Sequence, residues 1–147
     1  MYSYSIIVPV ARAYALAWLA AAAAGCFTAE SARRELDETS FGYHLDVRWL
    51  RCPAAAQRLD GDLRSSFIER CSGLEGRLSI DNVEILDVKL EPTNDEATVL
   101  VRYSFFVAPS VSLQTVMVKE RWRRQGASWR LVDGAWPDGR VATGSAT

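Results

Sequence analysis

The chain has 147 residues, with 17 basic and 18 acidic side chains and a formal net charge of −1 at pH 7. This length is enough for one domain with a hydrophobic core and too short for two. The nearly balanced charge excludes the strongly basic surface on which nucleic-acid-binding proteins depend, so we expect no nucleic-acid partner.

The first 29 residues hold one charged side chain, Arg12, which precedes an alanine-rich segment over residues 13–29. A positive residue, an apolar stretch of about 7–15 residues and small residues at a cleavage point are the features of a secretory signal peptide. The uncharged segment is short for a membrane-spanning helix, which needs about 20 apolar residues. We therefore expect residues 1–25 to be a cleaved signal peptide.

The end of this segment, Ala23-Ala24-Gly25-Cys26, resembles the lipobox of bacterial lipoproteins, in which the cysteine is lipidated and becomes the first residue after cleavage. Lipoboxes usually carry Leu, Ile or Val where this chain has Ala23. The resemblance implies an N-terminal lipid on Cys26, and Phe27 after it implies sorting to the outer membrane, on its periplasmic side. The alternatives are an ordinary secretory signal that leaves a soluble periplasmic protein, and an uncleaved N-terminal anchor.

The three cysteines are an odd number, which asks for an explanation in an exported protein. Lipidation of Cys26 leaves Cys52 and Cys71 as a pair, and disulfides persist in oxidising compartments. A bridge between them closes a loop of about 20 residues and contributes about 3 kcal/mol. The alternative is two buried free thiols. Because no C-x-x-C spacing occurs and His44 is the one histidine, we expect no metal site.

The side chains of two segments are mostly polar or small. Burying them cannot offset the conformational entropy that is lost when the backbone becomes ordered. Residues 26–38 are rich in charge and are expected to form a flexible tether. Residues 137–147 are expected to form a disordered tail. Residues 39–136 then form a single domain.

The first half of this domain has the apolar spacing of helices. Residues 40–51 are expected to be helical. The apolar residues of this helix form two adjacent stripes, Phe41, Leu45 and Trp49 and then Tyr43, Val47 and Leu50. Residues 53–59 begin with a proline and predict a second helix. A third helix is capped by Asp60 or Asp62 and ends at Gly73.

From residue 79 the period of apolar residues changes from that of a helix to two. The predicted strands are residues 79–90, 97–105, 111–124 and 129–132, with a slip near Leu86 in the first. Helices followed by consecutive strands with short turns predict an α+β fold with an antiparallel sheet of about four strands.

The element order and several segments resemble the nuclear transport factor 2-like (NTF2-like) superfamily, which includes SnoaL-like proteins. The matching segments are residues 43–49, residues 54–60, and a closing hairpin made of residues 119–122 and 126–133. The resemblance spans about residues 40–133 and implies N-terminal helices packed on a curved, cone-like sheet. It also implies that the domain is an enzyme or a binding or assembly module, since members of the superfamily are of all these kinds. The alternative is a cystatin-like or another helix-on-sheet fold.

One carboxylate of the closing hairpin is a candidate for chemistry. A symmetric hairpin places Trp122 opposite Leu131, and the same alternation puts Glu120 on the apolar face. The family resemblance implies that superfamily enzymes place acid–base groups on the concave face, where burial raises a carboxyl pKa. We favour the simpler alternative, in which a bulge turns Glu120 outward or Arg102 pairs with it.

Tyr103 and His44 are the other candidate pocket residues, together with Glu120. His44 and Asp46 lie two positions apart on a helix and so point away from each other, and we expect a solvated or rim histidine. No nucleophile elbow, phosphate loop or metal motif is present in the sequence. We therefore expect no catalytic residues, no metal and no cofactor.

The face of the predicted sheet away from the helices carries Leu100, Phe106, Leu113 and Met117. An apolar patch of this kind predicts a homodimer or an envelope protein as partner. The favoured function is therefore that of a non-catalytic binding or assembly domain of an outer-membrane lipoprotein. The alternative is a small-ligand-binding protein or enzyme that uses the interior of the cone. Large side chains in contact across the interior would argue against this alternative, and an open pocket with convergent polar groups would favour it.

Overall fold

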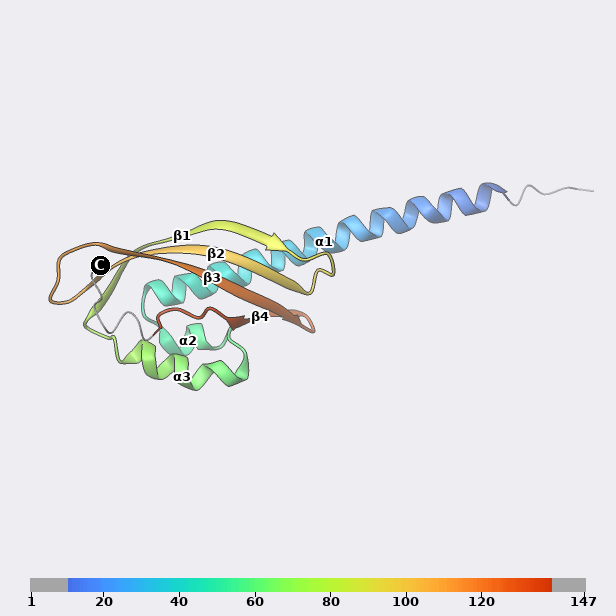
Figure 1. The fold of residues 1–147 in the computed structure, drawn as a ribbon. Helices are drawn as coiled ribbons and strands as arrows, with labels where there is room; N and C mark the ends of the chain where they lie inside the picture. Colours follow the sequence, from blue (N-terminus) through green and yellow to red (C-terminus); the bar gives the residue numbers. More distant parts are fainter. Residues whose placement is uncertain (1–10, 139–147) are drawn as a thin grey trace, which may run out of the picture.

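A computed structural model describes the backbone of residues 11–138 and the side chains of residues 29–138 (Figure 1). The elements in chain order are α1 (Ala11–Arg48), α2 (Cys52–Ala56), α3 (Gly61–Ser72), β1 (Leu78–Leu90), β2 (Glu96–Val107), β3 (Gln114–Gln125) and β4 (Ser128–Asp133). The signal-peptide cleavage point and most of the expected C-terminal tail lie outside the described side chains.

The four strands form one antiparallel sheet in the order β1-β2-β3-β4, and the helices pack against one of its faces (Figure 1). This confirms the α+β fold class expected from the sequence. The register of β1 and β2 shifts between Ile85 and Asp87, where the apolar alternation predicts a slip. Along β2 every second residue from Ala97 to Val107 is buried, so the inner face of the sheet is set by a period of two.

The α3 helix shows how the local sequence determines an element. Asp60 is its N-cap and accepts a hydrogen bond from the backbone nitrogen of Asp62, and Gly73 is its C-cap. Gln125 also donates to the Asp60 carboxylate (2.7 Å), which ties the start of α3 to the end of β3. This bond, followed by the bond from the Asp62 nitrogen, lowers the pKa of Asp60.

The N-terminal helix differs from the prediction. Residues 29–38 belong to α1, and Ala32 and Leu36 are fully buried. The indole nitrogen of Trp129 donates to the carbonyl of Ala32 (3.2 Å). The described part of the expected tether is therefore a helix docked on the sheet. These two apolar residues recur about one turn apart and continue the buried face of the helix, which compositional reasoning does not detect.

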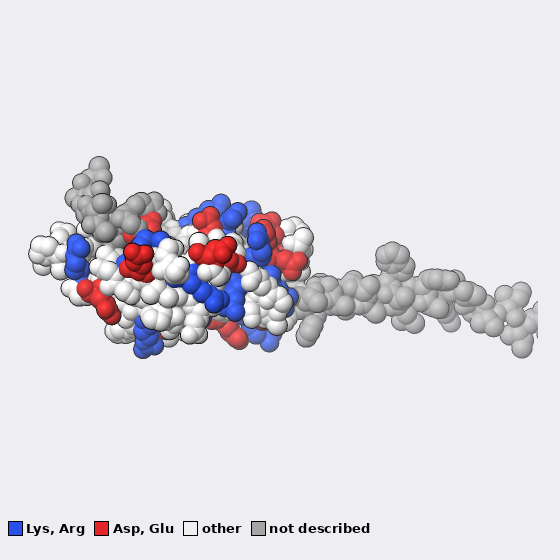
Figure 2. All heavy atoms as spheres, turned by 90° about the horizontal axis from the view of Figure 1, so that it is seen from below, with Lys and Arg blue, Asp and Glu red and all other residues white. Residues whose placement is uncertain are grey.

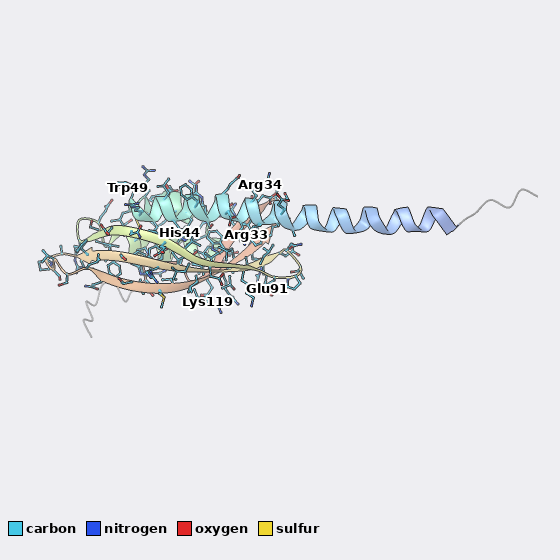
Figure 3. All side chains as sticks on the ribbon, turned by 90° about the horizontal axis from the view of Figure 1, so that it is seen from above. Arg33, Arg34, His44, Trp49, Glu91 and Lys119 are labelled. Carbon is cyan, nitrogen blue, oxygen red and sulfur yellow. A yellow bond between two sulfur atoms is a disulfide. The ribbon has the colours of Figure 1, made fainter. Side chains whose placement is uncertain are left out.

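Of the two apolar stripes of α1, the one with Tyr43 and Val47 packs on the sheet. Tyr43 and Val47 are fully buried, whereas Phe41 and Trp49 are 64% and 63% exposed. Figure 3 shows Trp49 on the side of α1 that points away from the sheet. No helix in the described part of the chain is both long and apolar enough to cross a membrane.

Candidate functional site

The buried carboxylate of Glu120 is the centre of the polar groups inside the fold. The β2–β3 register pairs Glu120 with Val99 and Trp122 with Ala97, all on the inner face. Glu120 is fully buried, so the outward orientation that we favoured from the sequence is wrong. Strand alternation holds through this part of β3 because its register with β2 is unbroken.

The structure brings the three candidate residues together. Glu120 Oε1 lies 3.0 Å from His44 Nε2 and accepts a hydrogen bond of 3.0 Å from the hydroxyl of Tyr103. Glu120 Oε2 accepts a hydrogen bond of 3.0 Å from the indole nitrogen of Trp122. Both carboxylate oxygens are thus satisfied by side chains from α1, β2 and β3, which is how buried polar groups are normally accommodated.

Two other sequence expectations are corrected at this cluster. His44 is 5% exposed rather than solvated, because it lies on the side of α1 that faces the sheet. Arg102, the alternative partner for Glu120, pairs with Glu84 (3.0 Å) on the opposite face of the sheet. As expected, the side chain of Asp46 points elsewhere and binds Arg58 (2.5 Å).

Aromatic side chains fill the interior around the carboxylate. Tyr103 stacks on Trp136 with ring centroids 4.3 Å apart, and Tyr43 meets Trp122 edge to face at 5.7 Å. The hydroxyl of Tyr43 donates to the carbonyl of Trp136 and accepts from its backbone nitrogen. Large side chains therefore touch across the interior. Trp136 follows β4, and no periodic pattern in the sequence pointed to it.

The tyrosines act as fixed hydrogen-bond donors. Burial, and then the negative charge of Glu120, raises the pKa of Tyr103 well above its ordinary value. The same two causes raise the pKa of Tyr43. Both hydroxyls stay protonated near neutral pH, and both are enclosed in the core. The cluster can hold a buried charge, but it offers its oxygens to no substrate.

Two hollows lie at the edge of this interior, and Trp122 lines one of them and His44 the other. The larger, about 420 Å³, lies at the turn between β1 and β2 and is lined by charges of both signs, among them Glu96 and Arg123, which pair with each other at 3.0 Å. The smaller, about 100 Å³, lies between α1 and β1, with His44 in its lining. Among the described residues, no group of three or more metal-ligating side chains is present.

Cys52 and Cys71 form a disulfide that joins the first residue of α2 to the last turn of α3. Both residues are buried, so the bridge is part of the core. The side chain of Cys26 lies outside the described side chains.

The apolar residues expected on the outer face of the sheet do not form a continuous patch. Leu113 and Met117 are 54% and 63% exposed, but Arg102 lies opposite Met117 and Lys119 lies opposite Leu100. The apolar residues of the sheet are therefore separated by charges. Figure 2, seen from the side of α2 and α3, shows that acidic and basic side chains are interspersed on that side of the molecule as well.

No family model and no curated protein matches the sequence. The fold resembles that of a ketosteroid isomerase-like protein from Erwinia carotovora atroseptica, with a TM-score of 0.55 and 14% identity over 67% of this chain and 89% of that one. A SEC-C motif containing protein from Rhodopseudomonas palustris aligns with a TM-score of 0.54 and 12% identity, over 65% and 73% of the chains. An NTF2-like protein with a cystatin-like fold from Novosphingobium aromaticivorans aligns at 16% identity and a TM-score of 0.48, over 95% and 97%. The chain therefore shares the fold of the ketosteroid isomerase-like protein and of the SEC-C motif containing protein, and at these identities the likeness shows the fold alone.

Proposed function

We propose that this protein is a non-catalytic binding or assembly domain, held at the periplasmic side of a bacterial outer membrane by a lipid on Cys26. The observation that carries the non-catalytic part is the filled interior. Both oxygens of Glu120 bind internal donors, and Trp136 packs on Tyr103 where a ligand of a cone-like fold would lie. An enzyme needs a polar group that reaches its substrate, and the carboxylate of Glu120 is instead taken up by donors of the core.

The cysteines support the envelope location. The Cys52–Cys71 bridge suits an oxidising compartment. It also uses two of the three cysteines and leaves Cys26 for lipidation. The helix α1 begins on the N-terminal side of Cys26 and continues into the core, so a lipid there would be joined to the domain without a disordered linker (Figure 1).

The intact mass of the membrane-extracted protein tests the anchor. We expect a chain that begins at Cys26 and carries added lipid mass. A Cys26→Ala variant should lose the lipid, whereas Cys71→Ala is the matched control, which loses the disulfide and keeps the lipid. An unmodified chain that begins at another residue, with a mass that Cys26→Ala changes only by the substitution itself, would refute the proposal.

Crosslinking in the envelope tests the partner. A photoreactive residue in place of the exposed Met117 should give one discrete adduct, with an envelope protein or a second copy of this chain. A photoreactive residue in place of the exposed Glu69, on α3, is the control and should give none. Equal adducts from both positions would show that the sheet face has no specific partner.

A further inference from the structure

The exposed side of the helix α1 and its C-terminal end carries a row of large apolar side chains. Phe41, Leu45 and Trp49 recur every four residues, so they lie along one side of the helix, and we call them the exposed stripe. Phe41 and Trp49 are almost two thirds exposed, and Leu45 is 40% exposed. Ile85 of the edge strand β1, also 40% exposed, lines the same small hollow as Phe41 and Leu45 and widens this apolar surface. Contiguous exposed apolar surface marks a site of interaction with a protein or a membrane.

The helix that carries the stripe is fixed to the edge of the sheet. Arg33 donates to the carbonyl of Val88 (3.4 Å), and Arg48 donates to the carbonyl of Asp81 (2.9 Å). Figure 3 shows α1 running along one flank of the sheet and continuing beyond the domain, with Trp49 on its outer side. A partner of the exposed stripe therefore lies along this flank, parallel to the helix.

The same helix passes through the proposed anchor residue. The backbone of α1 is helical from Ala11 to Arg48, so Cys26 and Phe41 belong to one rod. Phe41 lies 15 positions after Cys26, which is about 22 Å along a helix. A membrane that meets α1 at Cys26 and runs parallel to its axis therefore meets the exposed stripe as well.

The polar residues beside the stripe fit the surface of a bilayer. The guanidinium of Arg48 lies 5.9 Å from the centroid of the Trp49 ring, and the side chain of Arg51 is 60% exposed. Tryptophan is enriched where the acyl chains of a bilayer meet the head groups, and arginine is attracted to anionic head groups. The exposed carboxylates Asp37 and Glu38 lie at the other end of the stripe. The arginines thus surround the tryptophan, where contact with phosphates is needed.

We propose that the exposed stripe is a membrane-docking face. The helix α1 lies along the surface of a phospholipid bilayer, with the three apolar side chains at the boundary between head groups and acyl chains. Arg48 and Arg51 contact anionic head groups. The proposal rests on the proposed function for the presence of a membrane. It adds an orientation, since the domain lies on its α1 flank instead of standing on the end of the helix.

The fluorescence of Trp49 tests the contact. Among the described side chains Trp49 is the one exposed tryptophan, because Trp122, Trp129 and Trp136 are each 1% exposed. Trp18 is replaced by phenylalanine in every sample, so that a retained N-terminal segment contributes no emission. The membrane-extracted protein is reconstituted into vesicles of phosphatidylethanolamine and phosphatidylglycerol, with or without bromine on the acyl chains. Bromine quenches tryptophan on contact. We expect brominated vesicles to quench the parent and to leave a Trp49→Phe variant unquenched.

Two further variants locate the face. Phe41→Ser should reduce the quenching of Trp49 at least twofold, because it removes an apolar contact of the same stripe. Met117→Ser is the matched control, since Met117 is as exposed as Trp49 but lies on the outer face of β3, and it should be quenched as the parent is. Equal urea midpoints of the detergent-solubilised variants establish that each is folded.

The proposal is overturned if brominated lipid leaves the emission of Trp49 unchanged, if quenching persists in Trp49→Phe, or if Phe41→Ser and Met117→Ser behave alike. A second copy of the chain or an envelope protein on the stripe shields Trp49 and gives the first of these results. The intact mass of the same sample reports the lipid on Cys26 separately. A lipidated chain with unquenched Trp49 refutes the docking face alone. A chain without lipid refutes the anchor, and quenching by added vesicles still decides the docking face.

Discussion

The stability of the fold should depend on the buried carboxylate of Glu120. In Glu120→Gln the shape is kept, but the amide nitrogen must replace one of two oxygens that both accept hydrogen bonds. At least one of the Tyr103 and Trp122 donors then faces another donor. Leaving a buried polar group without its hydrogen-bond partner costs about 1–3 kcal/mol. We expect the free energy of unfolding to fall by that amount.

Urea unfolding of the oxidised protein measures this loss. A domain of this size has a slope of about 1–3 kcal/mol per molar urea, so the midpoint should fall by about 1 M with the slope unchanged. Glu84→Gln is the matched control, because Glu84 pairs with Arg102 at the surface, and such pairs contribute about 0–1 kcal/mol. If Glu120→Gln cost no more than Glu84→Gln, the buried network described here would be wrong.

Three further predictions concern other parts of the fold. Replacing Cys52 and Cys71 by alanine together should lower the free energy of unfolding by about 3 kcal/mol relative to the oxidised parent. The reduced parent is the control and should unfold at the same urea midpoint as the variant. Gly134→Ala should destabilise the fold strongly, because Gly134 has φ +81° and a Cβ there meets the backbone of β3. Gly61→Ala is the control, since a Cβ at that position meets nothing within 4 Å. An equal loss of stability in the two variants would contradict the clash. The pKa of Tyr103 is raised in the folded state, so its hydroxyl keeps its proton at a pH near 10.0, where the unfolded chain loses it. The contribution of Tyr103 to stability is therefore complete below that pH and falls as the pH rises toward the folded pKa. Unfolding midpoints between about pH 8 and about pH 11 should show a shallower decline for Tyr103→Phe, and an identical decline would refute this cause.

The strands could be predicted well because their two faces differ. Buried and exposed residues alternate almost without a break along β2 and β3. A period of two therefore predicts both the sheet and the position of Glu120 on its inner face. The same logic gives the ends of α3, where Asp60 and Gly73 are strong local signals. The preference for an outward Glu120 came from the cost of burying a charge. It failed because two of the three side chains that offset this cost, His44 and Tyr103, lie 76 and 17 positions away in the chain.

What could not be predicted depends on contacts between distant residues. His44 and Glu120 are 76 positions apart, and nothing within a helical turn of His44 indicates a carboxylate partner. Residues 29–38 read as polar because few of their side chains are apolar, although Ala32 and Leu36 are buried and the carbonyl of Ala32 accepts a hydrogen bond from Trp129. Composition averages over a segment, whereas docking depends on one face of it.

The bonds between Tyr43 and Trp136 join residues 93 positions apart, near the two ends of the domain. A nascent chain that has emerged only as far as β4 has its sheet residues but lacks the indole that stacks on Tyr103. Such a chain has an unfilled space in its core, and cavities of this size destabilise small domains severely. The domain thus completes its folding only after nearly all of it has been synthesised.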